Sequence, residues 1–508
     1  MTESLPGPAV AGVAEPGWHR MHWLTPALRS WQVVVFVLIY LVQDLGQNAL
    51  QGDAPLDGDG PHLGTGLIAG AGAILLLVVA AGVGLAVLSW RMSRYRVTED
   101  ALELNTGVLF RQQRRARLDR LQAVDVVQPF VARIVGLAKL KVEVAGGNDS
   151  QIQLSYLTEA DAQRLRNVLL ARAAGVHFDS GTEAPQAPEH EVLQVPVQRL
   201  LLSLLATPPT IVALLALVGF VASGVLAGNI APVGFAVPVV VGLGSMRWAR
   251  FTGGFGFRAA TSPDGLRLRH GLLEQRAQTV PPGRVQAVRV SQPLLWRPAD
   301  WWQVRVNIAG YGGGNRELEA ETTLLPVGSR DEAVAMLAQV LPDLDEIDGL
   351  QPRAVVEAGL SGRGDGAGFV GSPRSARWLD PLSWRRNAFR VTGQALLLRS
   401  GRLRRQLDVV PHARTQSIGV RQGPLERRLG LASFALHSTP GPIAPVMQHL
   451  ASDVAAALLA EQGVRARQAR ASAGPERWME GRAVEAAQDL SGEPHDAPET
   501  PQRSPVVE

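Results

Sequence analysis

The chain has 508 residues, 46% of them hydrophobic, and a net charge of only +4. Its length allows about three or four domains of ~150 residues, and its lack of cysteine excludes disulfides, thiol catalysis and cysteine-bound zinc. The net charge is small for this length, but the sequence pI of about 9.9 points mildly towards acidic partners such as anionic lipid or nucleic acid. Membrane lipids are the expected partner, and nucleic acid is not.

Residues 1–29 are the expected N-terminal leader and interfacial collar. They begin rich in Gly, Pro and Ala and continue with Trp18 and Trp23 among basic residues, a combination typical of a membrane interface. Residues 30–90 follow as the first predicted transmembrane hairpin, because one crossing needs ~20 apolar residues. The hairpin holds an acidic loop and is followed by arginines, so the positive-inside rule places the N-terminus and the domains in the cytoplasm.

Residues 199–247 form the second predicted hairpin. No charged residue occurs from Leu200 to Met246, a stretch long enough for two crossings. Pro208 and Pro209 are expected inside the third crossing, where they would kink it. We interpret the kink as packing geometry, although a kink can also mark a transport path.

A gap-free repeat organises the rest of the chain. The stretch Gly107–Val144 recurs at Gly271–Ile308 and at Gly401–Leu436, and such internal repeats indicate copies of one domain. Alternate apolar residues near the end of each copy indicate strands. The shared residues are Gly107, Arg120, Gln122 and Gln128; Gly271, Arg284, Gln286 and Gln292; and Gly401, Arg414, Gln416 and Gln422.

Three domains of one β-rich fold are therefore predicted, at residues 91–174, 248–342 and 377–462. In each, a hairpin that turns at the shared glycine precedes a basic strand, and a helix with an apolar face ends the copy. Ser329 and Glu332 have the spacing of a capping box at the start of one such helix. The expected architecture is a curled antiparallel sheet closed at one end by a C-terminal helix.

The repeat resembles a known bacterial family. Arg120-Leu-Gln122-Ala-Val124, Gln128-Pro129, Arg133 and Gly136-Leu137 are similar to the signature of the pleckstrin-homology-like (PH-like) domain of the YdbS/YdbT membrane proteins, and the order of hairpins and domains is similar to the YdbT-like members. The second copy departs from the signature at Asp300-Trp301. With the hairpins, the resemblance implies a mixed fold: four transmembrane helices plus three PH-like β-barrel or sandwich domains, each closed by a helix. It also implies a smaller, single-domain YdbS-like membrane protein as a partner.

The remaining segments are predicted to lack fixed structure. Residues 175–198 and 343–376 are rich in Gly, Pro, Asp and Ala, which is typical of flexible linkers. The tail at 463–508 is expected to be disordered. Arg363-Gly364-Asp365 in the second linker resembles an integrin-type tripeptide, and we discount it in a cytoplasmic linker.

The sequence contains no motif for catalysis, cofactor binding or metal binding. It has no Gly-x-Ser-x-Gly elbow, no phosphate-binding loop with its lysine and no His-Glu-x-x-His pair. The glycines at 310 and 312–314 fall between two predicted strands, so a hairpin loop is expected there. No cofactor is expected, and the protein is not expected to be an enzyme.

Three features are candidate binding surfaces. The Arg-x-Gln element either binds an anion or donates to a turn carbonyl, and the structural role is favoured because buried carbonyls need donors. The segment after Gln-Pro suits a membrane interface or a protein contact, or else a short helix over one barrel opening; its residues are Phe130, Arg133, Trp296, Arg297, Trp301, Trp302 and Arg427. The basic strands are either solvated or attracted to anionic lipid; their arginines include Arg111, Arg114, Arg115, Arg402 and Arg404.

These features predict a polytopic protein of the cell membrane that works as a scaffold and presents three cytoplasmic domains to its partners. Confinement near lipid raises the effective concentration of the domains for membrane-bound partners. The alternative is transport of a lipid or small solute through the four helices, with the domains as gates. The scarcity of charged residues in the crossings argues against an ion-coupled pump.

Overall fold

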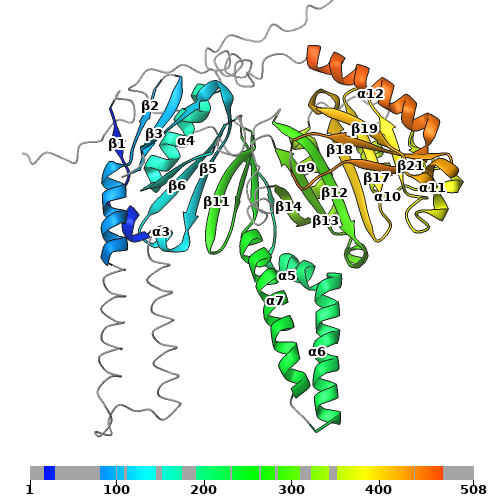
Figure 1. Ribbon diagram of the computed structural model, residues 1–508, viewed down its shortest axis with the longest axis horizontal. Coiled ribbons are helices and arrows are strands. Elements are labelled where there is room, and N and C mark those ends of the chain that lie inside the picture. The colour runs from blue at the N-terminus through cyan, green and yellow to red at the C-terminus, as the bar shows by residue number, and fades with distance from the viewer. Residues whose placement is uncertain are drawn as a thin grey trace, which may run out of the picture.

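The computed structural model describes residues 17–28, 80–98, 100–107, 111–144, 151–173, 190–228, 231–262, 265–280, 284–308, 322–341, 352–439 and 441–472. Across these ranges the strands form four antiparallel sheets, and three β-rich domains stand in a row on one side of a helical hairpin (Figure 1). Most of the first expected hairpin and the tail beyond residue 472 lie outside the described residues.

Each domain contributes four strands, then three strands, then a helix. The first domain contains β1 (His19–Arg20), β2 (Arg94–Val97), β3 (Ala101–Thr106), β4 (Gln112–Arg117), η1 (Leu118–Arg120), β5 (Leu121–Pro129), α3 (Phe130–Ile134), β6 (Leu137–Val144), β7 (Gln151–Thr158) and α4 (Glu159–Ala173). The second contains β8 (His190–Gln194), β9 (Arg258–Ser262), β10 (Gly265–His270), β11 (Glu274–Val280), β12 (Val285–Pro293), η2 (Leu294–Ala299), β13 (Trp302–Ile308), β14 (Thr323–Gly328) and α9 (Arg330–Val340). Between β8 and β9 the chain forms α5 (Val197–Leu205), α6 (Pro208–Leu226) and α7 (Ala231–Gly254).

The third domain follows the same plan. It contains α10 (Pro352–Ser361), β15 (Val370–Gly371), η4 (Arg374–Trp378), β16 (Ala388–Val391), β17 (Ala395–Ser400), β18 (Arg404–Pro411), η5 (His412–Arg414), β19 (Ser417–Arg421), α11 (Pro424–Arg428), β20 (Leu431–His437), β21 (Val446–Ala451) and α12 (Ser452–Ser472). The strands predicted on both sides of each shared glycine are therefore present in all three copies, and the repeat is confirmed.

The shared glycines form the predicted turns. Gly107, Gly271 and Gly401 have φ values of +105°, +113° and +74°, a region that L side chains rarely adopt. A Cβ at Gly401 would lie 2.1 Å from the Arg404 carbonyl oxygen. Only glycine fits this turn without moving the backbone.

The sheets do not stop at the domain boundaries. The order β7-β6-β5-β11-β10-β9-β8 joins the first domain to the second, and β14-β13-β12-β18-β17-β16-β15 joins the second to the third. Both junctions share one register, with Gln128 opposite Gln275 in the first and Gln292 opposite Arg405 in the second. Antiparallel pairing through the backbone therefore links the three domains into one continuous row.

The second predicted hairpin differs from the prediction at its prolines. The helix α5 ends at Leu205, and Pro208 and Pro209 begin α6 as its first residues, a position that needs no backbone N–H. They do not kink a crossing, so that expectation was wrong. Among the described helices, α6 is long and apolar enough to cross a membrane, and α7 packs beside it (Figure 1).

Several predicted linker residues are folded. The strand β8 lies in the first expected linker, α10 and β15 lie in the second, and α12 runs past residue 462 to Ser472. Val355 and Leu360 of α10 are fully buried, so apolar packing overrides the loop-like composition around them. The expected collar is also partly sheet, because His19 in β1 lies opposite Tyr95.

The closing helices pack as the sequence predicts. Leu165 and Leu169 of α4 are buried against the first domain. Ser329 caps α9 and forms the expected capping box with Glu332: the Glu332 N–H donates to Ser329 Oγ at 3.2 Å, and the Ser329 N–H donates to Glu332 Oε2 at 2.6 Å.

Candidate functional site

The repeated polar residues lie at the junctions between domains. Arg284 in the second domain donates from Nη2 to the Leu121 carbonyl of the first, at 3.1 Å. Arg405 in the third domain donates to Gln292 Oε1 of the second, at 3.3 Å. Both contacts cross a domain boundary, so the repeated arginine and glutamine serve domain docking as well as the fold of each copy.

The other members of the signature vary in their surroundings. Gln128 and Gln286 are buried, and Gln286 donates to the Arg284 carbonyl at 3.4 Å. Arg120 and Gln416 are exposed and Arg414 is half-buried. Gln422 donates to the Leu431 carbonyl at 2.8 Å. The side chain of Gln122 lies outside the described residues.

The tryptophans after the second Gln-Pro point inward. Trp302 is fully buried and donates to Asp300 Oδ1 at 2.9 Å. Trp296 is 5% exposed and donates from Nε1 to the Ser203 carbonyl on α5, at 3.0 Å. Trp301 is half-buried against Trp296. Trp296 and Trp302 therefore support the surface from beneath and do not form the exposed contact suggested by the sequence.

The first domain presents an apolar surface at the same step of the repeat. On α3, Phe130 is 53% exposed and Ile134 71% exposed, and Arg133 is exposed beside them. Ala132 on the opposite side of this short helix is buried, packing with Leu28 from the N-terminal segment. Apolar and basic residues exposed together suit a membrane interface.

A cluster of arginines surrounds the turn between β17 and β18, where the second and third domains meet. Arg297 lies on η2 and donates from Nη2 to the Arg402 carbonyl in the turn. Two leucines are exposed near these arginines in the sequence: Leu294, three residues before Arg297, is 44% exposed, and Leu403, directly after Arg402, is 61% exposed. We call this cluster the arginine rim; it comprises Leu294, Arg297, Arg363, Arg402, Leu403 and Arg405.

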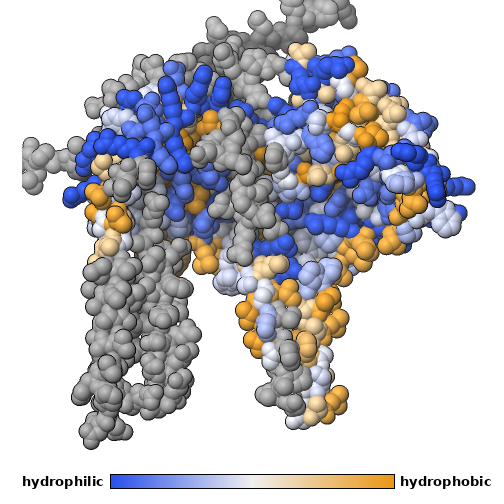
Figure 2. All heavy atoms as spheres, in the orientation of Figure 1, coloured by the Kyte–Doolittle hydropathy of each residue, from blue (hydrophilic) through white to orange (hydrophobic). Residues whose placement is uncertain are grey.

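The rim contacts the base of the α6–α7 hairpin through η2. Trp296, the residue before Arg297, bonds to α5, and α5 lies where the hairpin meets the second domain (Figure 1). Leu201, Leu202 and Leu205 of α5 are exposed. In the view of Figure 2, hydrophobic side chains are frequent on the described part of the α6–α7 hairpin, and hydrophilic ones predominate on the domains. The η2 part of the rim therefore lies beside α5, at the base of the hairpin.

The rim arginines repel one another. Burial, together with the charges of Arg405, Arg363 and Arg402, lowers the pKa of Arg297. Burial and the charge of Arg363 lower the pKa of Arg405. Within the described residues, Arg297 Nε is buried without an acceptor. A bound phosphate would relieve the repulsion, because guanidinium groups match its oxygens with paired hydrogen bonds.

Two buried arginines hold the segment that carries Arg363. Arg386 donates to the carbonyls of Gly359, Leu360 and Gly362, at 3.1, 2.7 and 2.9 Å. Arg399 donates to Ala358 at 3.2 Å. Burial, then the neighbouring arginines, lower the pKa of Arg386 to about 9. These guanidiniums cap the C-terminal end of α10, where free carbonyls favour positive charge.

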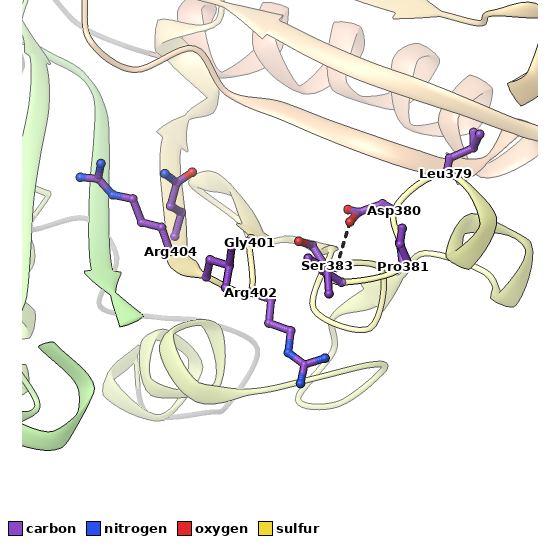
Figure 3. Close-up of a pocket in the computed structure, with 10 residues that line it drawn as sticks. Leu379, Asp380, Pro381, Ser383, Gly401, Arg402 and Arg404 are labelled. Atoms are coloured by element: carbon purple, nitrogen blue, oxygen red, sulfur yellow. Dashed lines mark hydrogen bonds between the residues drawn. The ribbon is translucent and has the colours of Figure 1, made fainter. Parts of the chain in front are cut away.

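A surface hollow of about 380 Å³ adjoins the rim at Arg402. Residues 379–383 form one side of it, and the turn from Gly401 to Arg404 forms the other (Figure 3). The Asp380 carboxylate accepts from the Ser383 N–H at 2.9 Å and from Asn387 Nδ2 at 3.0 Å, so it stabilises its own loop. Leu382 is 54% exposed and gives the hollow an apolar wall beside the arginine.

The other arginines of the basic strands have mixed roles. Arg404 donates across the second junction to Ser291 Oγ at 3.2 Å and to Gln303 Oε1 at 3.1 Å. Arg114 donates to the Gln151 carbonyl at 3.2 Å. Arg111 and Arg427 are exposed, at opposite ends of the row. The sequence indicated Arg405 only as part of a basic face with Arg402 and Arg404, and Arg363 was discounted as part of a linker tripeptide.

Comparison with known proteins agrees with this architecture. The sequence model described as "Bacterial PH domain" matches residues 38–173, 201–343 and 367–464. The chain belongs to the bacterial PH domain family. It is also 24% identical over 304 residues to the UPF0699 transmembrane protein YdbT of Bacillus subtilis (strain 168), a match that covers 54% of this chain and 60% of that protein. The resemblance to YdbT-like proteins is confirmed: this is a membrane-associated protein with repeated bacterial PH domains.

Proposed function

We propose that the protein is a non-enzymatic, multi-pass membrane scaffold that holds three PH domains as one rigid row on the cytoplasmic side. The observation that carries this proposal is the continuity of the sheets, in which β5 pairs with β11 and β12 pairs with β18. Backbone pairing restrains the domains far more than a linker does. A rigid row sets the spacing of the molecules that bind along it.

Two expected sites of membrane attachment support the same role. The helix α6 has the length and composition of a crossing, and the sequence predicts two further crossings within residues 30–90. The arginine rim supports contact with anionic lipid headgroups, because each arginine near an anionic leaflet adds ~1 kcal/mol of attraction. Lipid contact at the second junction would hold the third domain, which follows the last hairpin, against the membrane.

Affinity purification of the full-length protein in a mild detergent tests the scaffold role. Recovery of a second membrane protein in a fixed ratio, such as a smaller single-domain relative, would support it. A fixed ratio must persist after dilution and a salt wash. Recovery of the chain by itself, under conditions that preserve other membrane complexes, would contradict it.

Lipid handling is the second candidate function, because the rim and its hollow combine arginines with exposed leucines near α5. Fluorescent lipids in liposomes that contain the purified protein measure this activity. Movement of lipid between leaflets, lost in an Arg297→Ala/Arg402→Ala variant, would favour lipid handling. Movement equal to that of protein-free liposomes would exclude it.

A further inference from the structure

The two ends of the row carry the strands that are paired at the internal junctions. In the repeat, β4 is the equivalent of β11 and β18, because each follows its shared glycine at a similar distance. In the same way, β19 is the equivalent of β5 and β12. In the described part of the chain, β4 and β19 are the outer strands of their sheets. Such an edge presents backbone N–H and C=O groups that can pair with another strand.

One side chain of β19 is exposed where its counterparts in the first two copies are covered by a paired strand. Val420 is 40% exposed, whereas Val126 and Val290, at the same step of the first two copies, are 2% and 1% exposed. The β-branched residue is kept at this step in all three copies. It is buried in the two copies whose edge is paired.

The polarity of β4 is compatible with pairing. In the first junction the paired part of β11 is Glu274–Ala277, which has three polar residues and one alanine. The equivalent positions in the first copy, just before β4 and at its start, include Arg111, Gln112 and Gln113. An equally polar edge is therefore already paired inside this chain.

We propose that a second copy of this chain docks head to tail, with β4 of one copy pairing with β19 of the next. The second junction places Gln292 opposite Arg405, and Val290 opposite Leu407. The equivalent residues of the third and first copies are Gln422 and Arg111, and Val420 and Gln113. The same register would therefore place Gln422 opposite Arg111, and Val420 opposite Gln113, of the next copy. The arginine–glutamine contact of the internal junction is thus available at the ends.

A second contact of the second junction can form at the ends in the same register. Arg297 donates to the carbonyl of Arg402, one residue after a shared glycine. Arg427 lies at the same distance from its shared glycine as Arg297 and is exposed, so the assembly places it beside the turn at Gly107 of the neighbouring copy. Both side-chain contacts of the second junction are therefore available to the ends in one backbone register.

The partner is a second copy because both halves of the contact lie on this chain, one at each end. A head-to-tail contact of this kind generates a ring if it closes and a filament if it does not. The domains lie on one side of the α6–α7 hairpin (Figure 1), so the row extends along the membrane surface. This inference rests on the proposed scaffold role but not on lipid binding by the rim.

Disulfide cross-linking tests the register, since the chain has no cysteine of its own. Opposed residues of an antiparallel pair have Cα atoms ~4.5–5.5 Å apart, within the range of a disulfide. Oxidation of the purified full-length Val420→Cys/Gln113→Cys variant is expected to produce a ladder of dimers, trimers and larger species. Val420→Cys/Gln112→Cys is the matched control; its shift by one residue turns the side chain to the other face and reduces the ladder about tenfold.

The single variants give the decisive controls. A mixture of Val420→Cys and Gln113→Cys proteins must form dimers and nothing larger. Dimers from Val420→Cys alone would indicate a symmetric contact and overturn the proposal. A second result would also overturn the proposal: the purified double variant stays monomeric, and the Val420→Cys variant cross-links to a different protein in membranes.

A rim variant separates this result from lipid binding. Arg363→Ala/Arg402→Ala, added to the cross-linking pair, is expected to leave the ladder unchanged. A ladder lost together with the rim would show that lipid, and not strand pairing, holds the copies together. Each variant is compared with the parent chain by elution volume and circular dichroism, so that misfolding is not mistaken for lost contact.

Discussion

Arg289 and Asp408 form a two-pronged ion pair across the junction of the second and third domains, with Nε and Nη2 each 2.6 Å from a carboxylate oxygen. The side chain of Asp408 is 4% exposed and that of Arg289 is 16% exposed. The pair is thus largely withdrawn from water, where one charge without the other is costly.

Loss of one partner is therefore expected to destabilise the row more than loss of both. Arg289→Met leaves Asp408 buried without its counter-charge and should cost ~3 kcal/mol, and Arg289→Met/Asp408→Leu should recover most of it. Thermal unfolding in detergent measures the difference. Arg353→Met, which breaks an exposed ion pair with Asp331, is the control and should leave the transition unchanged. Equal losses in the single and double variants would show that the pair is not coupled.

The arginine rim is expected to bind a phosphate-bearing headgroup. Arg363→Ala/Arg402→Ala should weaken binding of short-chain phosphatidylglycerol by roughly 30-fold, because each arginine contributes ~1 kcal/mol. Titration of full-length protein in non-ionic detergent measures it, with inorganic phosphate run in parallel to separate a phosphate site from a lipid site. Arg428→Ala/Arg467→Ala removes two exposed arginines elsewhere and should leave the affinity within twofold. An equal loss in both variants would indicate a general charge effect and no site.

Trp296 is expected to couple the second domain to the membrane hairpin. Trp296→Ala should destabilise the protein by ~3–5 kcal/mol through the cavity it leaves. Trp296→Phe keeps most of the packing and should cost ~1 kcal/mol, because the Ser203 carbonyl loses its donor. Unfolding transitions of both variants check the order, and proteolysis near α5 should rise in parallel. Trp378→Ala, at a site 70% exposed, should change neither measurement.

Acid is expected to weaken the third domain through His412. Burial lowers the pKa of this imidazole, against the hydrogen bonds to the Thr392 carbonyl and Gln462. The unfolded state takes up a proton near the ordinary value of ~6.5, while the folded state resists it. Stability is therefore complete above that pH and falls as pH drops from it towards the folded-state pKa.

Unfolding profiles between pH 7.5 and 5 test this expectation. His412→Asn should have a lower transition at neutral pH and a shallower fall towards pH 5 than the parent chain. Burial lowers the pKa of His270 as well. The parent chain and the variant therefore both lose some stability towards pH 5, and the difference between their profiles measures the contribution of His412. Parallel profiles would show that His412 does not contribute.

Much of the fold was predictable because its signals are local. The turns at Gly107, Gly271 and Gly401 need a backbone that only glycine adopts freely, and alternation of apolar residues marks strands wherever they pair. The capping box at Ser329 is equally local. The three-domain plan follows from the spacing of such signals.

The candidate site was only partly predictable. Arg297 and Arg402 were recognised as binding candidates, but Arg363 was discounted because it lies in a segment with the composition of a linker. That stretch folds as α10 because Val355 and Leu360 find a core to bury in, a fact that its own composition does not reveal. The neighbours of each rim arginine come from distant parts of the chain.

The sequence by itself determined the repeat, the turn positions and the apolar stretch of α6, because each depends on residues close together in the chain. Only the tertiary structure decided what the repeated residues do. Arg284 bonds to Leu121 and Arg405 to Gln292 across domain boundaries, whereas Trp302 is buried within its own domain. The physical reason is that an exposed strand edge or arginine has no fixed partner until folding brings a second domain against it, and that pairing depends on the whole row.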